Sequence, residues 1–388
     1  MAARFWRSRG VVFVQNATRS FYMTGQSMSA PPPLRPVARV PPERFQLPVE
    51  RFRDGYYSDK YFARTRDVLA RSGRNPRVTV QVFQKQPAWL GGVDEAIAIL
   101  KTCLTGGYDW SDLDVYALRD GDTLTPYEAV MLITGPYLAF AHLETVYLGV
   151  MARRTRVSTN TRFVVEAAWP KPVMFFPARF DHWLVQTGDG YAAHIAGAIG
   201  VSTDAQASWW GSAGVGTMPH ALIAAFGGDT VEATLAFAAH TPADVPVVSL
   251  VDFNNDCVGT SLAVARALGS RLGGVRLDTS ESLVDRSVVP QMGAFDPRGV
   301  NPQLVRNVRN ALDAEGFSDV RIVVSGGFDP EKIRRFQAEG VPVDSYGVGS
   351  SLFRGQYDFT ADVVSVDGVP LSKTGRTHRP NARLELVS

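Results

Sequence analysis

The sequence predicts an α/β protein in which a mixed α/β domain is followed by a barrel, complete or nearly so. From about residue 170 onward, short apolar runs are each followed by a loop rich in Gly, Asp, Ser or Asn and then by a helix-like segment. This alternation is typical of a parallel sheet, and roughly six or seven such units point to a barrel. Ahead of it, strand-like and helix-like segments are mixed.

The first domain is expected over residues 43–168. Val78–Phe83 alternates in polarity and predicts a strand, and Val93–Leu104 predicts a helix. Pro126–Met151 is a longer apolar stretch that we interpret as helical, because Pro126 suits the first turn of a helix.

The barrel is expected over residues 169–355, with one short apolar run for each strand. The predicted strands are Val173–Phe176, Ala198–Val201, Val247–Val251, Gly274–Leu277, Arg321–Val324 and Val343–Tyr346.

Composition excludes several classes of protein. Forty Lys and Arg against 38 Asp and Glu give a net charge of +2, so no overall field favours nucleic acid or a membrane surface. The two cysteines, Cys103 and Cys257, are far apart, which excludes a disulfide scaffold and a thiolate zinc site and favours a reducing cytoplasm. The longest uncharged run, Ala205–Gly228, is too broken by glycine and Pro219 for a membrane-spanning helix.

Residues 1–42 are expected to form an extension outside the folded core. The segment contains no Asp or Glu, accumulates arginine and includes the proline run Pro31–Pro33. It is interpreted either as a disordered or mis-annotated start, with Met28 as an alternative first residue, or as a targeting segment.

Active sites of such barrels lie at the carboxyl ends of the strands, where this sequence is polar. Arg179 follows the first predicted strand, Asp252 follows the third, and Arg276 and Asp278 lie at the end of the fourth. Cations and carboxylates are therefore expected to converge on one mouth.

Two glycine-rich turns follow the last two predicted strands. Gly326 and Gly327 precede a helix start, whose free amide groups can hold a phosphate dianion, and Gly349 and Ser350 repeat the arrangement one unit later. Tight turns also occur without a ligand, but two neighbouring ones at this corner favour a phosphate site.

Residue spacing alone assigns neither a metal site nor a chemical role for a histidine. No His, Cys and Asp set has the spacing of a closed metal site, although Mg²⁺ held by one or two carboxylates and substrate phosphates is compatible. His220 begins an apolar helix after Pro219, where a histidine is often only a cap.

Taken together, the ordered motifs resemble those of the nicotinate phosphoribosyltransferase family over roughly residues 50–380. Singly each motif is weak, but their number, order and spacing make chance agreement improbable. The motifs are Asp59-Lys60-Tyr61-Phe62, Glu144-Thr145-Val146-Tyr147, Phe176-Pro177-Ala178-Arg179, Gly216-Thr217-Met218-Pro219-His220, Gly274-Val275-Arg276-Leu277-Asp278-Thr279, Val324-Ser325-Gly326-Gly327 and Tyr346-Gly347-Val348-Gly349-Ser350.

The resemblance implies an irregular or incomplete barrel, with residues 356–388 returning to the N-terminal domain, and a homodimer. It also implies the reaction of nicotinate with phosphoribosyl pyrophosphate, coupled to ATP hydrolysis, to give nicotinate mononucleotide and pyrophosphate. No nucleic acid or membrane partner is implied.

The resemblance also suggests roles for residues. His220 is expected to be catalytic and to carry a phosphoryl group from ATP. Arg162, Arg179 and Arg276 are expected to neutralise the charge of pyrophosphate or nicotinate, and Asp252 and Asp278 to bind ribose hydroxyls and Mg²⁺. The phosphate of the ribose is expected to bind to Gly326, Gly327, Gly349 and Ser350. The nicotinate pocket is expected to include Tyr57 and Thr217.

Two departures leave the ribose and metal contacts open. Thr279-Ser280-Glu281 replaces the commoner Ser-Gly-Asp, and Val251-Asp252-Phe253-Asn254-Asn255-Asp256 departs from the usual VDTYDT. The alternatives are a quinolinate or nicotinamide phosphoribosyltransferase on the same fold and a non-catalytic phosphate-binding barrel. Charged residues retained at the mouth argue against the last of these.

Overall fold

The computed structural model describes residues 39–293 and 295–387, which form two compact units. The N-terminal unit combines residues 39–162 with Thr187–Gly197 and residues 353–387. The barrel unit comprises Phe163–Gln186 and Ala198–Leu352. Most of the predicted extension 1–42 lies outside the described residues, but Arg39 already donates a hydrogen bond to Asp94 at 2.8 Å.

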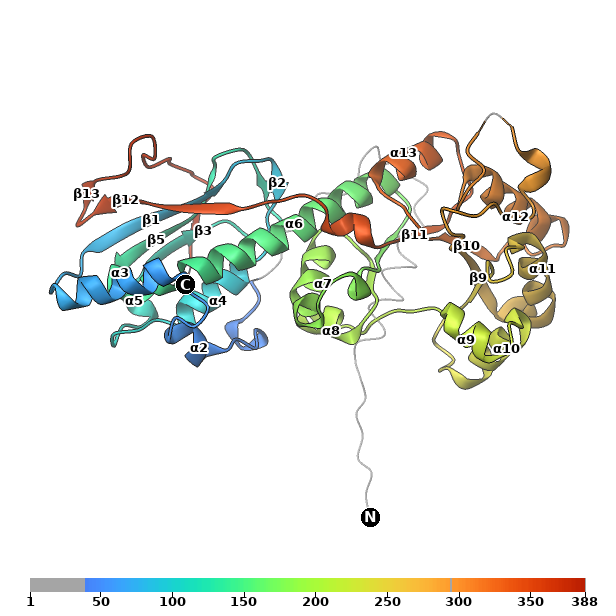
Figure 1. Cartoon of the computed structure of the whole chain (residues 1–388), viewed down its shortest axis with the longest axis horizontal. Coiled ribbons are helices and arrows are strands. Elements are labelled where there is room, and N and C mark those ends of the chain that lie inside the picture. Colours follow the sequence, from blue (N-terminus) through green and yellow to red (C-terminus); the bar gives the residue numbers. More distant parts are fainter. Residues whose placement is uncertain (1–38, 294, 388) are drawn as a thin grey trace, which may run out of the picture. The chain divides into compact units, whose positions relative to one another are not determined.

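The barrel unit is built on an open parallel sheet with the strand order β7-β6-β11-β10-β9-β8. Figure 1 labels its strands β11, β10 and β9. The six strands are β6 (Val173–Phe175), β7 (Gly200–Val201), β8 (Val247–Leu250), β9 (Leu272–Leu277), β10 (Arg321–Val324) and β11 (Ser345–Val348). Every paired neighbour runs parallel. The strands β7 and β8 remain at open edges, which confirms the prediction of an incomplete barrel.

Helices follow the strands because the loops between them supply helix starts. In α12 (Pro302–Ala314) the cap Asn301 accepts a hydrogen bond from the Leu304 amide, and Val308 and Leu312 continue the buried apolar face. Helices α11 and α12 lie side by side on the outside of the sheet (Figure 1). The other helices of this unit that follow strands are α8 (Asp204–Ala207), α9 (His220–Ala225), α10 (Thr230–His240), α11 (Cys257–Leu268) and α13 (Pro330–Ala338). Helix α7 (Gln186–Ile195) follows β6 in the chain but belongs, from Thr187 onward, to the N-terminal unit.

The N-terminal unit contains an antiparallel sheet with the order β13-β12-β1-β5-β3-β14. Alternate residues of β1, such as Val80 and Val82, enter a core shared with Ile99 and Leu100. The strands are β1 (Arg77–Gln84), β3 (Asp114–Ala117), β5 (Ala129–Pro136), β12 (Phe359–Val366), β13 (Val369–Pro370) and β14 (Glu385–Leu386), with β2 (Ala88–Trp89) and β4 (Thr123–Leu124) forming a separate pair. The helices are α2 (Val49–Arg53), α3 (Lys60–Arg71), α4 (Val93–Thr102), α5 (Tyr137–Phe140) and α6 (Glu144–Ala168).

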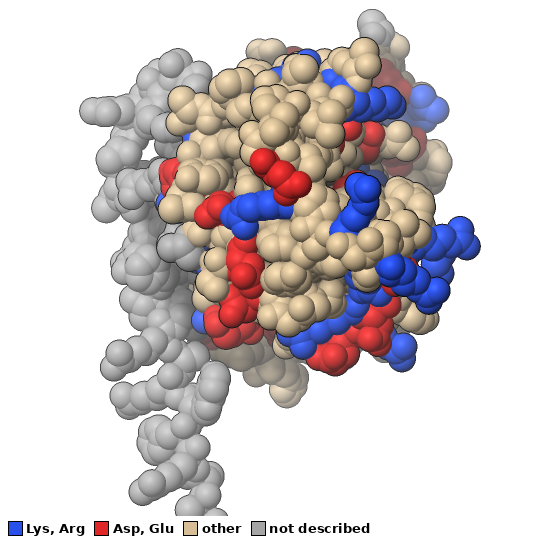
Figure 2. Space-filling model, turned by 90° about the vertical axis from the view of Figure 1, so that its left-hand side faces the viewer, with Lys and Arg blue, Asp and Glu red and all other residues tan. Residues whose placement is uncertain are grey.

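Charged side chains of both signs share the surface. On the face in Figure 2, Lys and Arg side chains lie beside Asp and Glu side chains on a largely uncharged surface. This mixture agrees with the net charge of +2, so any anion site has to be built from a local cluster.

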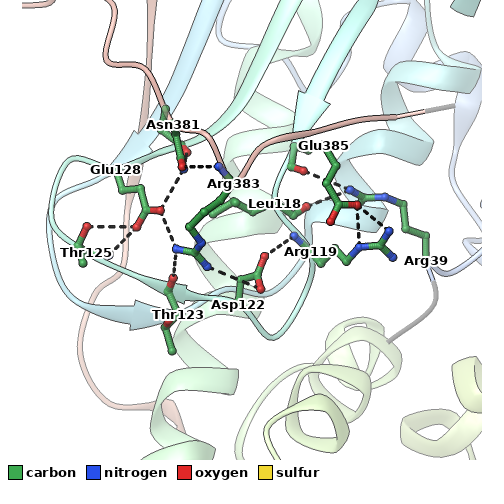
Figure 3. Close-up of polar contacts among 12 residues, drawn as sticks. Arg39, Leu118, Arg119, Asp122, Thr123, Thr125, Glu128, Asn381, Arg383 and Glu385 are labelled. Carbon is green, nitrogen blue, oxygen red and sulfur yellow. Dashed lines mark hydrogen bonds and ion pairs between the residues drawn. The ribbon is translucent and has the colours of Figure 1, made fainter. Parts of the chain in front are cut away.

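The C-terminal segment returns to the N-terminal unit, as predicted. Strand β12 pairs with β1, and β14 pairs with β3. Side chains reinforce the pairing (Figure 3): Arg383 donates to Glu128 at 2.7 Å, and Arg119 donates to Glu385 at 2.7 Å. Asn381 adds a hydrogen bond to the Ala129 carbonyl at 2.8 Å.

The predicted helix over Pro126–Met151 is wrong in its first half. Residues Ala129–Pro136 form β5, and helix α6 begins only at Glu144. The apolar run alone does not distinguish a buried strand from a buried helix. Pairing decides here, because β5 lies between β1 and β3 and bonds to both.

Candidate active site

Parallel pairing places the carboxyl ends of neighbouring barrel strands at one edge of the sheet. Across β6, β11, β10, β9 and β8, the residues that follow the strands are in turn a cation, two glycine-rich turns and two carboxylates. The register supports this alignment, since Val324 at the end of β10 pairs with both Leu277 and Tyr346. The residues are Arg179, Gly349-Ser350, Gly326-Gly327, Asp278 and Asp252.

The turn after β10 requires glycine. Gly326 and Gly327 have φ angles of +82° and +67°, which residues other than glycine rarely adopt. A Cβ at Gly326 would also lie 3.2 Å from Asp278 Oδ1. The chain then enters α13, where Asp329 accepts a hydrogen bond from the Lys332 amide at 3.0 Å.

The turn after β11 is held close to an aromatic side chain. A Cβ at Gly349 would lie 2.7 Å from the ring of Phe180, and that ring is approached by the Arg179 guanidinium at 5.6 Å from its centroid. Ser350 follows and is exposed. Arg179 and the Gly349 turn are therefore brought together through Phe180.

Asp278 is fixed by the neighbouring strand. The Ser325 hydroxyl, which lies between β10 and the glycine pair, donates to Asp278 Oδ1 at 2.8 Å. One carboxylate oxygen is thus engaged beside the Gly326 turn. The carboxylate and the turn form one local unit at the sheet edge.

Arg276 reaches from β9 to the loop before α9. Its Nη1 donates to the Thr217 hydroxyl, so the two predicted residues are in contact. Its buried Nε has no hydrogen-bond partner within the described chain. Burial lowers the pKa of Arg276, while the charges of Asp278 and Asp252 act in the opposite direction. A buried guanidinium with an unused donor is suited to an anionic ligand.

His220 and Asp252 form a hydrogen-bonded pair. His220 Nε2 lies 3.0 Å from Asp252 Oδ1, and the side chains are 45% and 7% exposed, respectively. Burial raises the pKa of Asp252, and the proximity of Asp278 contributes to the rise, whereas His220 opposes it. When the carboxylate accepts a hydrogen bond from Nε2, Nδ1 of the same ring keeps its lone pair.

Two predicted residues lie in the N-terminal unit. Tyr57 is 51% exposed and makes edge-on contacts with Phe52 and Tyr56, at centroid distances of 5.6 and 5.0 Å. Arg162 is buried on α6, with its guanidinium 5.9 Å from the centroid of the Trp89 ring. The structure therefore groups the remaining predicted residues in the barrel unit and leaves these two in the other.

Sequence reasoning missed Lys332 and the position of Glu281. Lys332 lies one turn into α13, with Nζ 3.4 Å from the Gly326 carbonyl oxygen and 4.4 Å from the centroid of the Phe328 ring. Its spacing of three residues from the cap Asp329 was the available signal, because such a lysine can fold back onto the preceding turn. Nothing in the spacing placed Glu281 against Gly327.

The carboxylates are suited to a magnesium ion whose remaining ligands come from substrate phosphates and water. Among the described residues no cluster of three or more His, Cys, Asp or Glu side chains could hold a metal by itself. Asp278 and Asp252 each use one oxygen in a hydrogen bond, which leaves the second oxygen available. Mg²⁺ is usually held by one or two carboxylates together with phosphates and water.

None of the helices within residues 39–293 and 295–387 has the length and apolar character required to cross a membrane.

Comparisons with known proteins give consistent relatives. A sequence-family model described as quinolinate phosphoribosyl transferase, N-terminal domain, matches residues 59–155. A nicotinate phosphoribosyltransferase of Mycobacterium tuberculosis is 34% identical over 286 residues, covering 71% of this chain and 58% of the relative. The chain therefore spans little more than half the length of that curated relative.

Solved structures extend the comparison to nearly the whole chain. Nicotinate-nucleotide pyrophosphorylase from Pyrococcus furiosus is 32% identical, with a TM-score of 0.75 over 89% of this chain and 86% of that chain. Human nicotinic acid phosphoribosyltransferase is 19% identical, with a TM-score of 0.67 over 83% of this chain and 77% of that chain, and so shares the fold.

Proposed function

Because this chain belongs to the nicotinate phosphoribosyltransferase family, we propose that it makes nicotinate mononucleotide and pyrophosphate from nicotinate and phosphoribosyl pyrophosphate. The ring nitrogen of nicotinate would form a bond to C1 of the ribose while the bond from C1 to the pyrophosphate oxygen breaks. The observation that carries the proposal is the row of a cation, two glycine-rich turns and two carboxylates along one edge of the barrel sheet.

Charge development explains why such a row suits the reaction. Departure of pyrophosphate leaves positive charge on the sugar and adds negative charge to the leaving group, so positioned charges contribute more than proton transfer. Arg179 and Arg276 would hold the pyrophosphate or nicotinate charge, with Arg162 of the N-terminal unit. The unused Nε of Arg276 supports this role.

The ribose would lie between the turns and the carboxylates. Gly326, Gly327, Gly349 and Ser350 would hold its phosphate through backbone amides. Asp278 and Asp252 would hold ribose hydroxyls and, directly or through water, Mg²⁺, which supplies neutralisation of the pyrophosphate charge. Their remaining carboxylate oxygens support this assignment.

Nicotinate itself would be bound by Thr217 and Tyr57. A hydroxyl donor suits the carboxylate of the base, and an aromatic ring suits its π face. Thr217 is already held against Arg276, and Tyr57 is half exposed in the N-terminal unit.

ATP hydrolysis would be coupled through His220. With Nε2 engaged by Asp252, Nδ1 would attack the terminal phosphorus of ATP and release ADP, and water would later remove the phosphoryl group. The protein would act as a homodimer. Two free, buried cysteines, Cys103 and Cys257, support a reducing compartment such as the cytoplasm.

A base-substrate assay tests the proposal. The full chain would receive phosphoribosyl pyrophosphate and Mg²⁺ with nicotinate, nicotinamide or quinolinate, each with and without ATP, while mononucleotide and ADP are followed. We expect turnover of nicotinate stimulated by ATP. Turnover of another base alone would overturn the nicotinate assignment, and no turnover with any base would reject the enzymatic function.

A further inference from the structure

An acidic side chain already lies on the turn that follows β10. A Cβ built on Gly327 would be 1.7 Å from Glu281 Oε1, so the carboxylate occupies the space directly over this residue. Gly327 is exposed and has a φ of +67°. Glu281 comes from the loop after β9, which also carries Asp278.

A cation lines the same cavity as the carboxylate. Lys332 folds back from α13, with Nζ 3.4 Å from the Gly326 carbonyl oxygen and close to the Phe328 ring. Burial lowers the pKa of Lys332, and the charge of Glu281 is the leading influence that opposes this shift. Glu281 and Lys332 line the same cavity, and the charge of the carboxylate favours the charged form of the lysine.

Space for a ligand adjoins these groups. Glu281, Gly327, Lys332, Arg335 and Glu331 line one cavity of about 740 Å³ in the barrel unit. Because Glu281 itself lines the cavity, its side chain has room to rotate away from Gly327. The cavity also gives an incoming anion access to Lys332.

We propose that Glu281 is an internal stand-in for a phosphate group: its carboxylate occupies the anion position on the Gly327 turn, and a phosphate monoester binds by displacing it. Two anions cannot share this position without strong repulsion. On displacement, Lys332 exchanges the carboxylate for the phosphate as its counter-charge. Glu281 therefore weakens phosphate binding and keeps Lys332 compensated when the turn carries no ligand.

The inference rests on the proposed function only in taking this turn as the site of the ribose phosphate. It goes beyond that function by giving roles to Glu281 and Lys332. It also explains why the departure Thr279-Ser280-Glu281 matters, since the longer acidic side chain is the one that reaches Gly327.

Binding of inorganic phosphate and of ribose 5-phosphate to the full chain, measured by titration calorimetry, tests this. We expect Glu281→Gln to bind both ligands about tenfold more tightly than the unmodified chain. Glu331→Gln removes the same charge from the same cavity without touching the turn, and should bind like the unmodified chain. In the double variant that combines Glu281→Gln with Lys332→Met, the gain in phosphate affinity should be lost.

Each outcome decides the inference. Equal phosphate affinities for the unmodified chain and Glu281→Gln would overturn it. An equal gain of affinity in Glu331→Gln would also overturn it, because the gain would then come from the loss of any negative charge in the cavity. If Glu281→Gln does not fold, Glu281→Asp shortens the side chain at constant charge and should still give a smaller gain; no gain there would also overturn it.

The same preparations separate this inference from the proposed function. A gain in phosphate affinity without nicotinate turnover by the unmodified chain would reject the function and keep the inference. Turnover of nicotinate without a gain in phosphate affinity in Glu281→Gln would keep the function and reject the inference.

Discussion

His220 Nε2 and Asp252 Oδ1 lie 3.0 Å apart, which joins the start of α9 to the loop after β8. Asp252 is almost fully buried, while nearly half of the His220 side chain is exposed. The pair therefore has a fixed, buried side and an accessible side. This geometry suits a histidine that is oriented by a carboxylate and reacts with an incoming group.

Replacing His220 by alanine is expected to remove ATP coupling. In His220→Ala, nicotinate mononucleotide should still form, but its rate with ATP should equal the rate without ATP, because no residue accepts the phosphoryl group. Mononucleotide and ADP would be measured together. His240→Ala, at an exposed helix end, is the matched control and should keep the stimulation. Full stimulation in a folded His220→Ala protein would contradict the role.

Replacing Arg276 by lysine is expected to lower the turnover number by about 10²–10³-fold. Lysine keeps the charge but loses the planar fork, so its single nitrogen cannot donate from the two separate positions that Nη1 and Nε of Arg276 occupy. Steady-state kinetics would measure kcat and KM separately. Arg271→Lys, whose side chain bonds the Ala238 carbonyl, should leave both unchanged. Wild-type kcat in Arg276→Lys would exclude a contribution of Arg276 to the reaction.

Replacing Gly326 by alanine is expected to weaken binding of phosphoribosyl pyrophosphate. Alanine at a φ of +82° costs about 1–2 kcal/mol of stability, and its Cβ would also press on Asp278. Gly340→Ala has a similar φ of +60° with open space around the Cβ, so it carries the backbone cost alone. KM should rise only for Gly326→Ala. A similar KM rise in both variants would assign the effect to stability.

Glu144 is expected to make stability depend on pH. Burial, together with the charges of Asp362 and Asp59, raises the pKa of Glu144 from 4.5 to about 8. Between these values the folded protein holds a proton that the unfolded chain has lost, so the free energy of unfolding falls as pH rises and levels off above about 8.

The variant Glu144→Gln isolates this effect. From pH 5 to pH 8 the unmodified chain should lose about 3 kcal/mol more stability than Glu144→Gln. Denaturant unfolding at both pH values would measure the difference. Glu50→Gln changes a carboxylate that is 79% exposed and should follow the unmodified chain. Parallel pH profiles for the unmodified chain and Glu144→Gln would contradict the raised pKa.

Deleting residues 1–27 is expected to leave melting temperature and activity unchanged. The segment has no acidic residue and too little apolar periodicity to form a core. The deletion keeps Arg39, whose guanidinium bonds Asp94 at 2.8 Å. Thermal unfolding and the nicotinate assay would be compared with the full chain. A large fall in melting temperature would show that the segment stabilises the folded protein.

The barrel could be predicted from the sequence because its strands are short apolar runs separated by polar loops. All six predicted barrel strands are present, with boundary shifts of at most two residues. The error at Pro126–Met151 has a different origin, since long-range pairing of β5 with β1 and β3 fixes its conformation. The assignment of residues 1–42 as an extension stays a prediction.

The site was predictable only as far as topology determines it. Once the strands are parallel, Asp252 and Asp278 must lie at the same edge of the sheet. Contacts such as Arg276 with Thr217, or Glu281 over Gly327, depend on how distant loops pack, and sequence spacing does not encode this. The chemical roles of these residues stay predictions that the experiments above decide.

The strand order of the N-terminal sheet affects how the protein is made. Strands β1, β3 and β5 are translated before the barrel unit, but their outer neighbours β12, β13 and β14 leave the ribosome only after it. Until then both edges of the early strands expose unpaired backbone groups. The N-terminal unit therefore cannot complete its sheet before the barrel unit has been translated, and the nascent chain passes through a stage that is prone to intermolecular strand pairing.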